Sequence, residues 1–255
     1  MDKNIFLGHD ESTYFAEKVL HLSQYFIPRG PNLFTLGLAS YLDCPDNKSM
    51  HLLGHVEKPQ SFDVYERYIH NAFAFNSILW SNFGDIYIRL ADFFSHCLAA
   101  PVCFASSKAL PGFHLYRINS NYQHQQYHVP HFDGQYQNLK WPPGLFHSSS
   151  LIQEPANLPT TLSFTLPLAL PIVGGGLRHW NISLLDQKTL SKQDFVSTLK
   201  SQTPEIQNYD LGCLIYHDGH KLHQIQSWRT CDEVEYRITM QGHLIFFKGV
   251  WIMYW

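Results

Sequence analysis

The chain is 255 residues long, with a formal net charge of −3 and a sequence pI of about 6.6. Its 18 lysines and arginines are scattered, so they form no concentrated basic face of the kind that nucleic acid requires, and we expect no nucleic-acid partner. With 45% hydrophobic and 15% charged residues, the composition excludes a disordered chain and favours one globular domain over 1–255.

The apolar segments are short, and the cysteines are unpaired in pattern. The N-terminal "MDKNIFLGHDES" lacks the apolar run of a signal peptide, and prolines and glycines break the longest apolar stretch, 162–177. No window reaches the ~20 apolar residues of a membrane span. Five cysteines without a CxxC pair argue against a disulfide framework and a thiolate zinc site. We therefore expect a cytoplasmic protein, no membrane partner, and buried reduced thiols.

The first hundred residues follow a helical period. With Ser12 as N-cap, the segment 13–27 places four apolar residues on one face, at steps of three and four: Phe15, Val19, Leu22 and Phe26. The segments 62–80 and 85–100 have a similar pattern and predict two further helices.

From Pro101 the pattern changes to short apolar runs separated by Pro, Gly, Asn and Asp, which are typical of strands in a sandwich or barrel. The runs are 112–118, 160–170, 176–185, 212–217, 235–247 and 249–255. One interruption, 191–202, has Ser191 as a cap and an amphipathic pattern, and predicts an inserted helix. The expected class is therefore α+β, with a mainly helical part over 1–100 packed on a β-rich core over 101–255.

The motif "HFD" can present two metal ligands to one point. Residues two apart in an extended segment point to the same side, so His131 and Asp133 face together while Phe132 faces away. A third ligand from a distant strand would complete the two-histidine, one-carboxylate set that holds non-haem Fe(II). A surface turn before Gly134 explains the same residues equally simply.

Two later segments supply further candidates. The segment "GCLIYHDGHKLHQI" (212–225) contains three histidines around a turn at Asp218 and Gly219. The segment "EYRITMQGH" places Arg237 and Thr239 two apart, on one face of a strand. A guanidinium beside a hydroxyl is a good receptor for a carboxylate, because the arginine fork can bind it bidentately.

In their order along the chain, the HxD motif, the glycine-rich "GGGL", the distal histidine and the Arg-x-Thr motif resemble the Fe(II)/2-oxoglutarate-dependent dioxygenases. The resemblance covers roughly Gly112 to Ile245 and implies a double-stranded β-helix (jelly-roll) core. It implies that the metal triad, and hence the catalytic centre, consists of His131, Asp133 and His223. It also assigns the binding of the far carboxylate of 2-oxoglutarate to Arg237 and Thr239, with Tyr116 as a further hydrogen-bond donor.

Spacing selects the distal histidine. His223 lies 14 residues before Arg237 and matches the family better than His220 at 17 or His217 at 20, which we assign to a turn or the surface. Five other aromatic or imidazole side chains stay open: His128 beside the ligands or in solvent, His179 and His243 as pocket or structural residues, and Trp141 with Phe146 as ligand contacts or core caps.

The resemblance implies an enzyme that uses Fe(II), 2-oxoglutarate and O2 to oxidise an unactivated C–H bond, with hydroxylation as the first expectation. The first choice of substrate is a small molecule such as an amino acid or a natural-product intermediate, and the second is a peptide or protein side chain. Two other classes stay open: a cupin-type metalloenzyme that does not use 2-oxoglutarate, and a non-catalytic jelly-roll binding protein.

Overall fold

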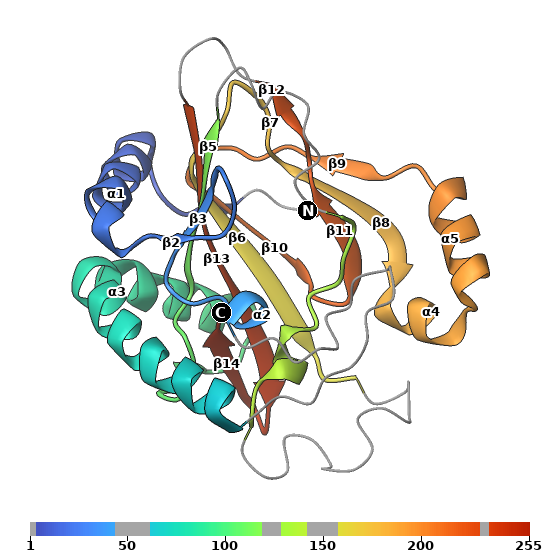
Figure 1. Cartoon of the computed structure of the whole chain (residues 1–255), viewed down its shortest axis with the longest axis horizontal. Helices are drawn as coiled ribbons and strands as arrows, with labels where there is room; N and C mark the ends of the chain where they lie inside the picture. The colour runs from blue at the N-terminus through green and yellow to red at the C-terminus, as the bar shows by residue number, and fades with distance from the viewer. Residues whose placement is uncertain (1–3, 44–61, 119–128, 142–157, 230–234) are drawn as a thin grey trace.

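The computed structural model describes residues 4–43, 62–118, 129–141, 158–229 and 235–255 (Figure 1). Nine described strands form a large sheet: β1 (Asn4–Ile5), β2 (Ile27–Pro28), β3 (Leu33–Leu36), β4 (Val102–Phe104), β5 (Gly112–Ile118), β6 (Thr161–Ala169), β10 (Cys213–Asp218), β13 (Glu235–Phe247) and β14 (Val250–Tyr254). A smaller sheet contains β8 (Leu177–Ser183), β9 (Glu205–Gln207) and β11 (Lys221–Ile225), and β7 (Val173–Gly174) pairs with β12 (Trp228–Arg229).

The order of the strands defines the architecture. Eight extended segments follow one another in the chain: β5, the segment at His131, β6, β8, β9, β10, β11 and β13. In the large sheet β13, the eighth segment, lies between β5, the first, and β6, the third. The sixth segment, β10, pairs with the other edge of β6. In the small sheet the segment at His131, the second, pairs with β11, the seventh. On its other edge β11 pairs with β8, the fourth, and β8 pairs with β9, the fifth. All these pairs are antiparallel, and this is the order of a double-stranded β-helix, or jelly roll.

Helices cover the outside of both sheets (Figure 1). The helices α1 (His9–His21) and α3 (Phe62–Cys97) bury their apolar faces in one cluster with β6 and β13. The helices α4 (Leu184–Thr189) and α5 (Lys192–Ser201) lie against the small sheet, where Phe195 packs with Trp180 and Leu222. None of the described helices is both long and apolar enough to cross a bilayer.

The N-terminal helices differ in detail from the prediction. Ser12 is not the N-cap, because α1 begins at His9, and the side chain of Glu11 accepts a hydrogen bond from the backbone N–H of Gly8 (2.9 Å). The two segments predicted after residue 62 form one helix, α3, interrupted only by Phe83 with φ −130° and ψ 19°. Three short strands that the helical period did not predict, β1, β2 and β3, join the large sheet from this part of the chain.

The cysteines also differ from the prediction. Cys213 is buried, but Cys97 and Cys103 are exposed, because they lie at the end of α3 and in the short strand β4. All three are free thiols, and Cys44 and Cys231 lie outside the described residues.

The strand β13 separates the polar interior of the jelly roll from its apolar outside. Ile238, Met240 and Leu244 belong to the cluster that packs under α1 and α3. The alternate residues face the other way, and four of them are polar: Arg237, Thr239, Gln241 and His243. The residues opposite Gln241 and His243 on β6, Thr165 and Ser163, are polar as well. The sheet therefore turns its hydrogen-bonding side chains toward the small sheet.

A glycine at the start of β5 provides a test of this packing. A Cβ atom on Gly112 would overlap the ring of Trp255 and lie 2.7 Å from the backbone oxygen of Leu36, which cannot move without moving β3. We expect Gly112→Ala to lower the free energy of unfolding by about 1–3 kcal/mol in urea titrations. The control Gly30→Ala adds a methyl group with nothing within 4 Å and should change it by less than ~0.5 kcal/mol. Equal stability of the two variants would contradict the packing described.

Candidate metal centre and carboxylate site

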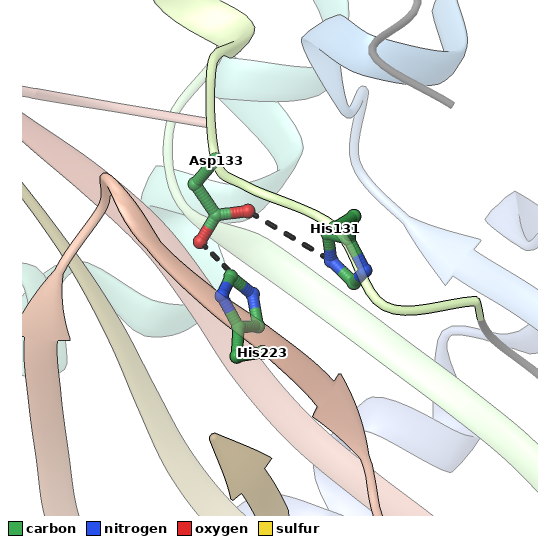
Figure 2. Close-up of side chains that lie close together, drawn as sticks. All are labelled: His131, Asp133 and His223. Carbon is green, nitrogen blue, oxygen red and sulfur yellow. Dashed lines mark ion pairs between the residues drawn. The ribbon is translucent and has the colours of Figure 1, made fainter. Parts of the chain in front are cut away.

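Three candidate ligands meet between the two sheets (Figure 2). His131 and Asp133 lie on the extended segment that precedes the short helix η3 (Gln135–Asn138), and His223 lies on β11. His131 and His223 exchange two backbone hydrogen bonds of 2.9 and 3.0 Å. Phe132 points away into the cluster beneath α5, as the alternation of an extended segment predicts.

The donor atoms of His131, Asp133 and His223 all lie within 4.8 Å of one another. His223 Nε2 is 3.4 Å from Asp133 Oδ2, and His131 Nε2 is 3.9 Å from Asp133 Oδ1. In both imidazoles Nδ1 is 2.9 Å from a backbone carbonyl oxygen, of Val129 or of Lys221. Since Nδ1–H donates to these carbonyls, the lone pair of each Nε2 faces the centre, which is the arrangement of metal-binding histidines.

The electrostatics keep these groups in the protonation states that a metal needs. Burial lowers the pKa of His223 to about 3, against the opposing effect of Asp133, so the imidazole is neutral at neutral pH. Burial alone would raise the pKa of Asp133, but the surrounding imidazoles, with His223 first, hold it well below its usual range. A carboxylate and neutral imidazoles are the forms that bind metal ions.

Gln135 orients the carboxylate and was not predicted from the sequence. Its Nε2 donates to Asp133 Oδ1 over 2.9 Å, while Oδ2 faces His223. The amide oxygen of Gln135 is buried and has no hydrogen-bond partner among the described residues. The helix η3 begins at Gln135, so the alternation that places His131 and Asp133 on one side ends before it and gave no signal for this contact.

The structure corrects part of the prediction for the other two histidines of the 212–225 segment. His220 lies in the turn after β10, as predicted, but it is buried, with Nε2 close to the hydroxyls of Tyr136 (3.2 Å) and Thr161 (3.4 Å), so it is not a surface residue. His217 is half-buried, and its ring lies 4.7 Å from that of His223, beside the triad. The turn after β10 passes from the large sheet to the small one, and this rotation brings both rings inward.

The remaining aromatic and imidazole candidates have separate surroundings. His243 is buried on the interior face, with Nδ1 3.0 Å from Ser163 Oγ, and His179 lies opposite His223 with Nε2 3.7 Å from Glu205. Trp141 packs its ring against Tyr254 (5.2 Å), which makes it a core cap. His128 and Phe146 lie outside the described residues.

The second part of the site surrounds Arg237, which is fully buried. Its Nε donates to the carbonyl of Gly175 (2.9 Å), and one terminal nitrogen is 3.4 Å from Thr239 Oγ1. The other terminal nitrogen is buried without a hydrogen-bond partner among the described residues, and none of their acidic side chains forms an ion pair with the guanidinium. Burial lowers the pKa of Arg237, but an arginine stays charged in a protein.

Two tyrosine rings flank this guanidinium, Tyr116 and Tyr209, each 5.7 Å from Cζ. Tyr116 is buried and lies on β5 directly opposite Arg237, the residue with which the prediction from the sequence grouped it. Tyr209 lies in the connection between β9 and β10, where only a turn signal is visible in the sequence. The chain is therefore a jelly-roll protein whose interior holds a His-Asp-His cluster and a buried arginine with a free nitrogen.

No family model and no curated protein matches the chain. It is structurally similar to an N-substituted L-amino acid dioxygenase from Burkholderia ambifaria AMMD, at 16% identity and a TM-score of 0.49, over 88% of this chain and 86% of that one. The same enzyme in complex with alpha-KG has a TM-score of 0.47, at 16% identity over 88% and 86% of the two chains.

Two other solved structures are similar at lower identity. The non-heme alpha-ketoglutarate-dependent carbocyclase SnoK from nogalamycin biosynthesis has 12% identity and a TM-score of 0.43, over 95% of this chain and 80% of that one. A Pseudomonas putida prolyl-4-hydroxylase has 11% identity and a TM-score of 0.39, over 97% and 92%. All these TM-scores are below 0.5, so the jelly-roll assignment rests on the strand order of this chain.

The buried histidines make stability depend on pH. Burial lowers the pKa of His220 and of His243, although nearby carboxylates oppose it. The unfolded chain therefore binds more protons than the folded chain as the pH falls below ~6.5. In EDTA, we expect the free energy of unfolding to be highest above pH ~6.5. Below that pH it should fall, by at most ~1.4 kcal/mol per pH unit for each such histidine.

Urea titrations near neutral and mildly acid pH measure this dependence. His243→Asn should make the free energy of unfolding depend less steeply on pH, because one depressed imidazole is gone. The control His70→Asn, at an exposed position of α3, should leave the dependence as it is. An unchanged dependence in His243→Asn would contradict the effect assigned to this histidine.

Proposed function

We propose that the chain is a non-haem Fe(II)- and 2-oxoglutarate-dependent oxygenase. In this proposal His131, Asp133 and His223 hold the iron, and Arg237 with Thr239 binds the far carboxylate of 2-oxoglutarate. The observation that carries the proposal is the presence, inside one jelly roll, of a His-Asp-His cluster and a buried guanidinium with an unpaired nitrogen.

The donor set fits the metal. Two imidazoles and one carboxylate, with no fourth ligand in the cluster of described residues, match the set that holds Fe(II) and leaves positions open. Gln135 supports Asp133 by fixing one of its oxygens. When bound, iron and 2-oxoglutarate supply the oxidising chemistry, in which O2 and the keto acid yield CO2, succinate and an oxidised substrate C–H.

The surroundings of Arg237 fit the co-substrate. A buried charge without a counter-ion costs several kcal/mol, so a site of this kind calls for an anion. One terminal nitrogen of the guanidinium lies 3.4 Å from the hydroxyl of Thr239, and the other is free among the described residues, so the guanidinium and this hydroxyl can together bind one carboxylate. Tyr116 and Tyr209 flank the guanidinium, and in the proposal Tyr116 donates to the same co-substrate. A cupin-type enzyme that does not use 2-oxoglutarate has no need of this arginine.

The proposed reaction is hydroxylation of a small molecule in the cytoplasm. A carboxylate at position 133 supports it, because halogenating relatives have a small residue there. The interior is lined by polar side chains on β13 and β6, which suits a compact substrate with hydrogen-bonding groups. The single-domain organisation over 1–255 belongs to the proposal as well.

The metal ligands can be tested by iron binding. We expect His131→Ala and His223→Ala each to abolish stoichiometric binding of Fe(II) under anaerobic conditions, because two ligands hold the ion far more weakly than three. His179→Ala, which removes a histidine opposite His223 but outside the cluster, is the matched control and should bind one iron. Full iron content in either ligand variant would refute the triad.

The arginine can be tested by anaerobic titration of the iron-loaded chain with 2-oxoglutarate, followed through the weak visible metal-to-ligand charge-transfer band. Arg237→Ala should weaken 2-oxoglutarate binding by on the order of a hundredfold, because a charge-assisted pair is lost, and should leave iron binding largely intact. Arg237→Lys keeps the charge without the guanidinium fork, so its affinity for 2-oxoglutarate should lie between that of the unsubstituted chain and that of Arg237→Ala. Equal loss of iron and 2-oxoglutarate in Arg237→Ala would mean that the residue is structural.

A further inference from the structure

A hydrogen-bonded pair outside the proposed iron and 2-oxoglutarate ligands faces the same interior. The hydroxyl of Tyr41, on the short helix α2 (Ser40–Asp43), lies 2.6 Å from His114 Nε2, on β5. His114 shares the interior face of β5 with Tyr116, and its partner across the sheet on β13 is Thr239. The pair therefore borders the proposed site of 2-oxoglutarate.

The pair also faces the candidate metal centre. The pKa of Tyr41 is raised well above its usual range, first by burial and then by the negative charges of Tyr116 and Asp133. The helix α2 packs on η3, which follows directly after the HxD segment. Tyr41 nevertheless keeps part of its surface accessible, while His114 behind it is buried. The phenol is thus partly accessible and lies on an element packed against the helix that follows His131 and Asp133.

The wall around this pair is aromatic and holds unused hydrogen-bond donors. The ring of Trp255 covers Gly112 on the interior face and lies 5.2 Å from the ring of His114. The indole N–H of Trp255 and the hydroxyl of Ser40, next to Tyr41, are both buried and have no hydrogen-bond partner in the part of the chain that the structure describes. Buried donors of this kind are costly unless a ligand or water uses them.

The charges near the pair are already balanced. Arg29, which acts on Tyr41, binds both oxygens of Asp43 through its terminal nitrogens and Thr35 through Nε. In the proposed enzyme the positive charges of Fe(II) and Arg237 equal the negative charges of Asp133 and of the two carboxylates of 2-oxoglutarate. A charged group placed against Tyr41 would therefore lose its hydration without gaining a counter-charge from the described residues.

We propose that Tyr41 and His114 bind an uncharged hydrogen-bonding group of the substrate, a hydroxyl or a carboxamide, attached to an apolar body with a ring. The inference rests on the proposed function and narrows its substrate class. Because an imidazole can carry its proton on either nitrogen, the pair can offer the substrate a donor or an acceptor. Hydroxyls and carboxamides can do both.

This assignment changes the order of the substrate classes. A free amino acid would bring an ammonium and a carboxylate, and the described interior has no spare partner for either beyond the arginine proposed for 2-oxoglutarate. A neutral natural-product intermediate can bind beside Tyr41 and His114 without removing a charged group from water. Within small molecules, the uncharged class is therefore preferred to the free amino acid.

Four probes with one ring and different head groups test the inference: 2-phenylethanol, phenylacetamide, phenylacetate and phenethylamine. Their dissociation constants are measured by saturation-transfer NMR on the full chain loaded with Zn(II) and 2-oxoglutarate. Zinc replaces iron so that the protein cannot oxidise the probes during the measurement. We expect the alcohol and the amide to bind at least about tenfold more tightly than the acid and the amine. Tyr41→Phe should weaken the alcohol and the amide about fivefold and leave the charged probes unchanged.

Tyr14→Phe, at an exposed position of α1, is the matched control and should leave all four dissociation constants as they are. Tighter or equal binding of the acid or the amine, an unchanged preference in a folded Tyr41→Phe, or no measurable binding of the alcohol and the amide would each overturn the inference. Succinate formation by the unsubstituted iron-loaded protein without a probe reports on the proposed function alone. Succinate without head-group selectivity refutes only the assignment of Tyr41 and His114.

Discussion

Two backbone hydrogen bonds between His131 and His223 determine the geometry of the candidate metal centre. They attach an otherwise irregular segment to β11, and a third bond, from Asp133 N–H to the carbonyl of Gly219, fixes the segment one step further on. Side chains at paired positions of two strands lie on the same side, so the two imidazoles become neighbours. Both rings then need only a local backbone acceptor at Nδ1 to turn Nε2 toward Asp133.

Within the same jelly roll, a single strand, β13, carries apolar side chains on one face and polar side chains on the other. Ile238 and Met240 contribute to the core under the helices, whereas Arg237 and Thr239, one residue away on the same strand, face the interior. Burying a polar face is costly unless its groups are paired, and pairs such as Ser163 with His243 meet part of this requirement. Among the described residues, one terminal nitrogen of Arg237 is left free where the proposed co-substrate would bind.

The strands of the core could be predicted from the sequence, and β5 and β13 have the predicted bounds, because apolar runs between turn residues carry a strong signal. The strands β1 and β2 could not, since two residues show no alternation. The inward position of His220 depends on the path from one sheet to the other, which no local pattern contains. The contact of Tyr41 with His114 joins residues 73 apart, and Tyr209 reaches Arg237 from a loop.

The hydrogen bond from Arg237 Nε to Gly175 has a consequence for the length of a bound diacid. Gly175 has φ +74°, a backbone conformation that favours glycine, and its carbonyl holds one edge of the guanidinium. Anchored along this edge, the guanidinium cannot swing toward a shorter ligand or withdraw from a longer one. In the proposed enzyme, the span between the triad and the arginine would therefore limit which diacids reach both, according to the number of carbon atoms between their two carboxylates.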